Sequence, residues 1–286
     1  MLTSLDHVVI AVRDLEAATA TYTALYGRSP SWRGTHPVWG TANTLFRLAN
    51  TYVELLAPAG AGRHAEVLRA QLAARGDGPY ALAFGCADAE VAAAALRAAG
   101  LAAGDPVAAA GRALGSALER QWRSVFLPLS DTRAVPMLAI AHRSPAALLP
   151  PAAAGPGGAT IDAIDHVVIM TADADGASAL YRDRLGLRLA FDRTFDARGL
   201  RLLFFRIGGI TVEVAAPLAA GVDADRDADR FWGISYRVAD IDAVRARTLA
   251  AGFDVSAVRD GHKPGTRVCT VRAETHGVAT LLLQPA

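Results

Sequence analysis

Cysteine is scarce in this chain, which has only two among 286 residues. Cys86 and Cys269 lie in apolar segments typical of strands, so we expect reduced thiols and no disulfide framework. An excess of either charge is also lacking, because the net charge is +1, and this argues against a nucleic-acid partner or an anionic membrane surface. No apolar run is long enough to cross a bilayer, and residues 1–6 lack the features of a signal peptide. These absences favour a cytoplasmic protein.

What the chain does contain is an internal repeat at one constant offset, which extends without a gap over more than fifty positions. The segment Asp-His-Val-Val-Ile occurs at residues 6–10 and again at residues 165–169. Further identical pairs keep the same offset: Tyr22 and Tyr181, Gly27 and Gly186, Gly40 and Gly199, Phe46-Arg47 and Phe205-Arg206, Glu54 and Glu213, Pro58 and Pro217. The chain therefore contains two related halves.

A boundary between the halves is predicted at residues 144–160, which carry no charge and many Pro and Gly residues. Such a segment resists helix and strand alike and is typical of an interdomain linker. We therefore expect one domain over residues 1–143 and a second over residues 161–286, each long enough for its own core.

Each half is predicted to contain two β-α-β-β-β modules, which we number one to four along the chain. Every module opens with an apolar strand, continues with a helix that begins after an Asp and ends at a Gly, and closes with apolar strands. The expected strands lie around residues 5–12, 44–48, 51–57, 80–87, 135–141, 164–170, 187–192, 201–207, 210–215, 232–239, 268–272 and 278–283. The expected helices follow Asp14, Asp88, Asp173 and Asp240.

The polar residues repeated inside these apolar strands are one histidine and one glutamate. If the first and last strands of a module are neighbours, His7 and Glu54 meet on one face of the sheet, and so do His166 and Glu213. Imidazole and carboxylate are ligands of divalent Zn, Mn, Fe, Co and Ni. Burial of an isolated carboxylate costs free energy, so each Glu needs a partner for its charge. Each pair is therefore half of a candidate metal site.

These features together resemble the vicinal oxygen chelate superfamily, which contains glyoxalase I, methylmalonyl-CoA epimerase, extradiol dioxygenases and bleomycin-resistance proteins. The opening strand Asp-His-Val-Val-Ile and the segments 40–46 and 52–58 are most similar to bacterial glyoxalase-like proteins. The resemblance implies an α+β fold, in which four βαβββ modules form two glyoxalase-like domains with cupped mixed sheets. It also implies a divalent metal in each cup, with ligands at the positions of His7, Glu54, His166 and Glu213.

Modules two and four depart from that pattern, and this leaves the site open. The positions aligned with the ligands hold Ala81, Leu138, Gly233 and Leu281, none of which binds a metal. Modules one and three can pair across the domains to give one four-ligand site. Alternatively, each half-site borrows another side chain or holds the metal weakly through substrate and water. A third alternative is that no metal binds and that the pairs are hydrogen-bonded relics. We expect at least one pair to function, with the second domain favoured.

Other side chains are weaker candidates. In extradiol dioxygenases a comparable loop carries an active-site histidine, so His262 is a candidate acid, base or substrate contact, although an exposed loop residue is the simpler interpretation. Tyr52 shares the face of Glu54 and is a candidate lining residue. Arg206 is a candidate contact for an anionic substrate, and Phe205 for an aromatic one. For His36, His64 and His142, surface positions are expected.

The function predicted from these residues is that of a divalent-metal-dependent isomerase or lyase, which acts on a small oxygenated substrate through a metal-stabilised oxyanion. Glu213 or Glu54 would ligate the metal or act as base, and the protein would be a monomer or homodimer. The alternatives are a metal-free binding protein of the bleomycin-resistance type and an atypical ring-cleaving dioxygenase. For the binding protein, Trp32, Trp39, Phe204, Phe205 and Trp232 are candidate pocket residues.

Overall fold

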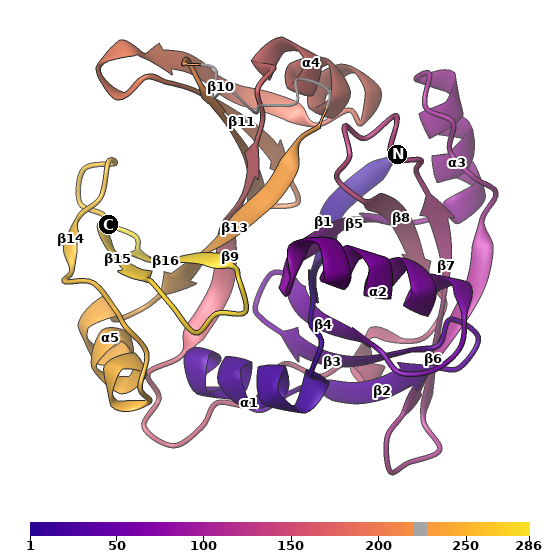
Figure 1. Cartoon of the computed structure of the whole chain (residues 1–286), viewed down its shortest axis with the longest axis horizontal. Coiled ribbons are helices and arrows are strands. Elements are labelled where there is room, and N and C mark those ends of the chain that lie inside the picture. The colour runs from indigo at the N-terminus through magenta and orange to yellow at the C-terminus, as the bar shows by residue number, and fades with distance from the viewer. Residues whose placement is uncertain (220–227) are drawn as a thin grey trace.

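The computed structural model describes residues 1–219 and 228–286 and confirms the α+β fold with two glyoxalase-like domains (Figure 1). The first half contains, in chain order, β1 (Leu2–Ala11), α1 (Leu15–Tyr26), β2 (Trp32–His36), β3 (Thr41–Arg47), β4 (Tyr52–Pro58), α2 (Arg63–Arg75), β5 (Gly78–Cys86), α3 (Ala89–Ala98), β6 (Val107–Ala113), β7 (Glu119–Phe126) and β8 (Met137–His142). Strands β2, β6 and β7 were not predicted individually, because their sequences mix small, polar and charged residues.

The second half has the same succession of strands, and its first helix is shorter. It contains β9 (Ile161–Met170), α4 (Ala174–Ser178), the π-helical turn η2 (Ala179–Arg184), β10 (Arg188–Phe195), the 3-10 turn η3 (Asp196–Arg198), β11 (Leu200–Ile207), β12 (Ile210–Pro217), β13 (Arg230–Val238), α5 (Ile241–Ala250), β14 (Arg259–Asp260), β15 (Arg267–Val271) and β16 (Ala279–Gln284). The helix predicted after Asp173 therefore widens into a π turn, which keeps Leu180 and Tyr181 buried against the sheet.

Local signals set the helix boundaries. The side chains of Asp14, Asp88, Asp173 and Asp240 each accept a hydrogen bond from a backbone N–H in the first turn of the helix that follows. Gly27 ends α1 in the left-handed conformation, with φ at 63°. The helix starts expected from the sequence are thus confirmed.

Modules pair within each domain. The first sheet is a closed barrel in the order β1-β4-β3-β2-β6-β7-β8-β5, and its two modules meet where β1 runs antiparallel to β5. The barrel closes through a short seam, in which Gly34 pairs with Ala113 and Thr35 with Arg112. The second sheet has the order β10-β11-β12-β9-β13-β16-β15-β14 and stays open between β10 and β14. Pairing of modules one and three across the domains is therefore excluded.

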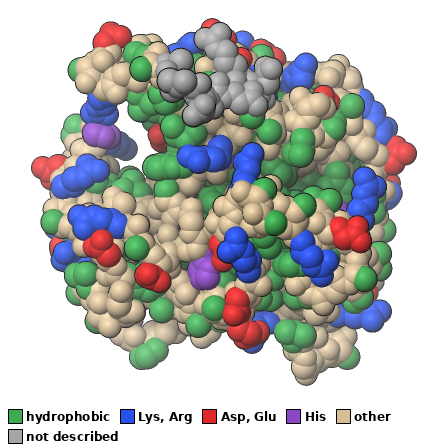
Figure 2. Space-filling model, in the orientation of Figure 1, with side chains coloured by type: hydrophobic (Ala, Val, Ile, Leu, Met, Phe, Trp, Pro, Cys, Tyr) green, Lys and Arg blue, Asp and Glu red, His purple; other side chains and the backbone are tan. Residues whose placement is uncertain are grey.

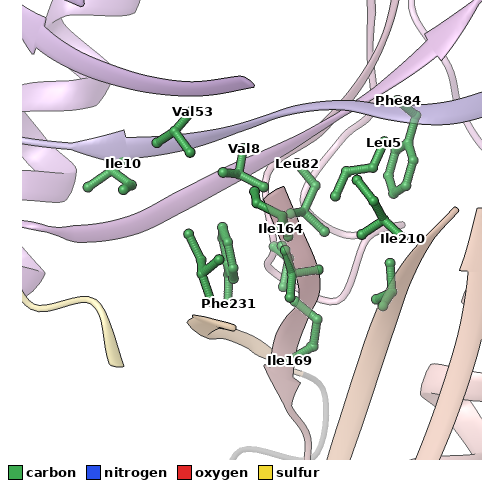
Figure 3. Packing of buried hydrophobic residues seen from close by; sticks show 14 of the residues in the cluster. Leu5, Val8, Ile10, Val53, Leu82, Phe84, Ile164, Ile169, Ile210 and Phe231 are labelled. Carbon is green, nitrogen blue, oxygen red and sulfur yellow. The ribbon is translucent and has the colours of Figure 1, made fainter. Parts of the chain in front are cut away.

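The main core lies between the two sheets, which pack back to back (Figure 3). Val8, Ile10 and Val53 project from the outer face of the barrel toward Ile169 and Phe231 of the second sheet. One buried cluster spans both halves of the chain. Since strand side chains alternate, His7 and Glu54 project into the barrel, whereas His166 and Glu213 lie on the opposite, concave side of the second sheet.

The segment over residues 144–160 lies along the first domain. It contains the 3-10 turn η1 (Ala146–Leu148), and the buried residues Leu149 and Ala152 anchor it. The backbone N–H of Ala152 donates to the carbonyl oxygen of Arg47 at 2.9 Å. Within the described residues, no helix has the length and apolar character needed to cross a membrane.

Candidate functional site

The barrel of the first domain encloses a cavity of about 550 Å³. This volume lies in the range of small-molecule sites. Helix α2 crosses in front of the barrel (Figure 1), and Arg63, His64 and Val67 from this helix line the cavity. Because strands wall the cavity and a helix covers it, polar groups inside are largely removed from water.

His7 lies between two carboxylates inside this cavity. Its Nδ1 is 2.7 Å from Oδ1 of Asp6, and its Nε2 is 3.4 Å from Oε2 of Glu54. Burial alone would lower the pKa of His7, but the two carboxylates outweigh it and raise the pKa to about 9. Contacts with His142 and His7 hold the pKa of Asp6 below its usual range, and contacts with His7 and Asn43 do the same for Glu54, against the opposing effect of burial. At neutral pH the site is therefore an imidazolium between two carboxylates.

A β-bulge places Asp6 beside His7. In the pairing of β1 with β5, Leu5 lies opposite Phe84 and His7 opposite Ala83, so Asp6 is the extra residue. A bulge re-aims side chains that simple alternation would send to opposite faces. The second sheet repeats the device, because Asp165 is the extra residue between Ile164 and His166 in the pairing of β9 with β13. Alternation alone therefore missed the role of the Asp in the repeated Asp-His dipeptide.

Asn43 and His36 extend the polar wall around Glu54. Nδ2 of Asn43 donates to Oε1 of Glu54 at 2.7 Å and lies 3.3 Å from Nε2 of His36, while Nδ1 of His36 is 2.9 Å from Oγ1 of Thr41. His36 is only 4% exposed, so the predicted surface position is wrong for this residue. It was misplaced because β2 was not recognised. The strand could have been recognised from the alternation of its residues, because every second one is buried: Trp32, Gly34 and His36.

The other two histidines expected at the surface also lie near the site. His64 is half-buried, and its ring lies 4.6 Å from that of Trp39, so it is less exposed than predicted. His142 is exposed as predicted, yet it lines the cavity and its Nε2 is 3.0 Å from Oδ2 of Asp6. Both positions depend on contacts between distant segments, which the sequence does not display.

Strand β7 supplies a further wall that sequence reasoning missed. Arg120, Trp122, Ser124 and Phe126 alternate along it and all line the cavity. Arg120 is 8% exposed, and its guanidinium lies 5.8 Å from the centre of the Tyr52 ring. Tyr52 in turn lines the cavity and stacks on His7, with ring centres 4.5 Å apart.

The second sheet carries the same trio in a more open setting. Nδ1 of His166 is 2.8 Å from Oδ2 of Asp165, and its Nε2 is 3.5 Å from Oε2 of Glu213. Burial raises the pKa of Glu213 despite the nearby His166. Figure 2 shows a hollow at the left of the molecule, between the lobes that carry β10 and β14 in Figure 1.

Three other predicted site residues occupy different surroundings. Phe205 is fully buried against Tyr181 on the core side of β11, so the lining role predicted for it is wrong. Its neighbour Phe204 lies opposite Glu213 and shares the concave face instead. Arg206 is exposed and lies on the concave side, in register with Thr211 next to His166. His262 lies on the exposed loop after β14, where its Nδ1 is 3.1 Å from Nη2 of Arg198.

Neither pair meets the donor requirement of a catalytic transition-metal site. Such a site uses three protein ligands. In the barrel, the positions aligned with His7 and Glu54 hold Ala81 and Leu138, which line the cavity with apolar groups. In the part of the chain that the structure describes, no group of three or more His, Cys, Asp or Glu side chains is arranged to hold a metal ion. The residues present therefore do not fit the metal that the resemblance implies.

Two family models match the chain. Residues 5–163 match a model described as a glyoxalase-like domain. Residues 165–270 match one described as the glyoxalase/bleomycin resistance protein/dioxygenase superfamily. No curated protein sequence matches the chain. The two matches support metal-dependent enzyme chemistry in general and specify no reaction.

Among the solved structures that match, the following two share the fold over nearly the whole chain. A mutant of 4-hydroxymandelate synthase from Streptomyces coelicolor aligns over 99% of this chain and 93% of its own, with 16% identity and a TM-score of 0.70. A hypothetical protein from Staphylococcus aureus covers 98% of both chains with 10% identity and a TM-score of 0.67. Methylmalonyl-CoA epimerase from Mycobacterium tuberculosis is 27% identical over 46% of this chain and 92% of its own, with a TM-score of 0.39. At these identities the first two likenesses show the fold alone.

Proposed function

We propose that this chain, which belongs to the vicinal oxygen chelate superfamily of glyoxalase-like proteins, is an isomerase or lyase that moves a proton on a small oxygenated organic compound inside the barrel of the first domain. The observation that carries the proposal is the position of His7 and Glu54, which face each other at 3.4 Å on the wall of the barrel cavity. A base and an acid within reach of one bound molecule are the requirement for proton transfer.

Glu54 acts as the base, His7 as the hydrogen-bond donor to the substrate oxygen, and Asp6 orients His7. Glu54 has acceptor positions left beyond its contacts with Asn43 and His7, so one carboxylate oxygen accepts a proton from a C–H bond next to an oxygenated carbon. The electron pair of that bond moves onto the substrate oxygen. His7 lies in a long ion pair with Glu54, so its Nε2–H is available to donate to this oxygen, while Asp6 orients the ring through Nδ1. Return of the proton gives isomerisation, and loss of a leaving group gives elimination.

The barrel is a better chamber for this reaction than the second sheet. The exposed fraction of the side chain is 6% for His7 and 16% for His166. Electrostatic stabilisation of a developing oxyanion is larger where water is excluded. The preference for the second domain that we drew from the sequence is therefore replaced by a preference for the first.

Hydrogen exchange tests the proposal across a whole class of compounds, so the substrate itself need not be identified first. A panel of 2-oxo and 2-hydroxy carboxylates is incubated with the purified chain in deuterium oxide, with and without chelator, and loss of the C–H signal is followed by NMR. We expect exchange of at least one compound, insensitivity to chelator, and a loss of about 100-fold or more in the Glu54→Gln variant. Glu66→Gln, which changes an exposed carboxylate on α2, serves as the matched control.

Two results would overturn the proposal. One is equal exchange in the wild type and the Glu54→Gln variant. The other is a chelator-sensitive exchange with one metal ion per chain, lost on mutation of His7 or Glu54, since this would restore the metal site that the donor set argues against.

A binding protein that sequesters an aromatic compound is the second candidate. The observation that favours it is a cluster of rings over the cavity, in which Trp39 lies 5.8 Å from Trp122 and 6.1 Å from Phe126, measured between ring centres. Tight binding of an aromatic compound without any exchange or turnover would support this candidate over the enzyme.

A further inference from the structure

Arg120 is a buried cation without an ionic partner among the described residues. Its side chain makes no ion pair or hydrogen bond with any residue in the described part of the chain, although it is more than nine-tenths buried. Its contacts are with two rings, because the guanidinium carbon lies 5.7 Å from the centre of Trp32 and 5.8 Å from that of Tyr52. Cation–π contacts are weaker than the hydration that a buried guanidinium gives up. An anion is therefore the partner that this residue lacks.

Two further polar atoms in the cavity are unsatisfied. Oγ of Ser124 and Oδ1 of Asn43 are buried and have no hydrogen-bond partner among the described residues. Both residues line the same cavity as Arg120. Buried polar groups are nearly always paired, so several unpaired groups around one cavity indicate a ligand with polar atoms.

The placement of Arg120 relates the anion to the reacting pair. The Tyr52 ring lies 5.8 Å from the Arg120 guanidinium and stacks on His7, and all three side chains line the cavity that also holds Glu54, so an anion on Arg120 shares this cavity with the reacting pair. Along β7, Trp122 lies two residues from Arg120 on the same face, which is about 7 Å at the rise of a strand. A group of that length extends from the guanidinium to the rings of Trp122 and Trp39.

We propose that the barrel binds a small aromatic carboxylate, whose carboxylate pairs with Arg120 and whose ring packs against Trp122 and Trp39. The planar guanidinium matches a carboxylate with two parallel hydrogen bonds. The carbon next to the carboxylate then lies beside His7 and Glu54, where a proton can be removed. This inference rests on the proposed function in taking the barrel as the reaction site, and it adds the class of substrate.

Calorimetric titration of the full chain tests this assignment with two probe pairs, benzoate with benzamide and phenylacetate with phenylacetamide. Each pair keeps the ring and changes only the charge. We expect at least one carboxylate to bind about tenfold or more tightly than its amide, a ratio that corresponds to roughly 1.4 kcal/mol. Arg120→Gln should remove this preference. Arg112→Gln, which changes an exposed arginine on β6, should keep it.

Two additional variants distinguish failure of the carboxylate site from misfolding and from failure of the proposed reaction. Arg120→Lys keeps the charge without the planar fork and should retain part of the preference, which also guards against misfolding of Arg120→Gln. Glu54→Gln should keep the carboxylate preference even if it abolishes hydrogen exchange, so the site can be right while the reaction is wrong. Equal binding of acid and amide by the wild type, no binding of either acid, or a preference that survives in Arg120→Gln would overturn the proposal.

Discussion

The two domains carry the same Asp-His-Glu trio on the same bulged strand, yet they give it different environments. In the first domain the seam between β2 and β6 closes the sheet, and the trio lies inside a covered barrel. In the second domain the sheet stays open, and the side chain of Glu213 is 19% exposed, compared with 12% for Glu54. Repetition of the residues therefore does not imply repetition of the site.

The neighbouring residues have diverged as well. At the position of Asn43, which donates to Glu54, the second half has Leu202, and at the position of Tyr52 it has Thr211. Glu213 thus lacks the hydrogen-bond donor that stabilises the charge of Glu54. The pKa of Glu54 is lowered mainly by its contact with His7, to which His36 and Asn43 add, whereas burial outweighs the weaker influence of His166 and raises the pKa of Glu213. The repeat preserved the trio, and the surrounding strands determined what it can do.

The largest expected difference between the two domains is in turnover. Glu54→Gln should reduce the rate constant of proton exchange by about 10²–10⁴-fold, because it removes the base from the reaction chamber. Glu213→Gln is the matched change in the open sheet and should leave the rate within about twofold of the wild type. NMR exchange kinetics on both variants measure this ratio, and equal losses would show that the domains are functionally equivalent.

The pH dependence of stability provides a second contrast. The pKa of His7 is raised from 6.5 to about 9 in the folded chain, so folding favours the protonated ring. The resulting stabilisation is complete below pH 6.5 and is lost as the pH rises through 9, a change of about 3 kcal/mol. Urea unfolding at pH 7 and pH 10 should therefore differ more for the wild type than for His7→Gln.

His64→Gln is the control for that experiment, because burial lowers the pKa of His64 and the ring is neutral over this range. This variant should keep the pH difference of the wild type. A pH difference in His7→Gln as large as in the wild type would contradict the assignment of the charge to His7.

Exchange of the residues at positions 43 and 202 should make the pKa values of Glu54 and Glu213 more alike. Asn43→Leu removes the donor to Glu54 and should cost roughly 1.5–3 kcal/mol of stability, as for a lost hydrogen bond to a charged group. It should also raise the pKa of Glu54. Leu202→Asn should lower the pKa of Glu213. Carboxyl carbon NMR titrations measure both values, and no change in either would show that this neighbour is not the cause of the difference.

The smallest expected effect is a loss of stability when the seam between β2 and β6 is altered. A Cβ at Gly34 would lie 2.6 Å from the carbonyl oxygen of Arg112 across the seam, so Gly34→Ala should destabilise the protein by about 1–2 kcal/mol. At Gly104 the nearest atom to a new Cβ is the carbonyl oxygen of Phe126 at 3.5 Å, an ordinary contact, so Gly104→Ala is the control. Chemical unfolding measures both, and an unaffected Gly34→Ala variant would indicate that the seam is loose.

The repeat and the apolar periodicity were enough to predict the fold class, the four modules and most helix starts, because these depend on local signals such as Asp14 and Gly27. The sequence also indicated which strands bring His7 and Glu54 together. It did not reveal Asp6 as the second partner of His7, because a bulge breaks the alternation on which the prediction relied. Nor did it reveal Arg120, because β7 joins the wall only through the pairing of distant strands.

Nitrogen-15 NMR of the His7 ring tests the account most directly, because its central claim is that closure of the barrel holds an imidazolium between Asp6 and Glu54. We expect both ring nitrogens to carry protons at pH 7.5 and to titrate together near pH 9. A ring that is neutral at pH 7.5, or one with a nitrogen shifted by a bound metal ion, would contradict it.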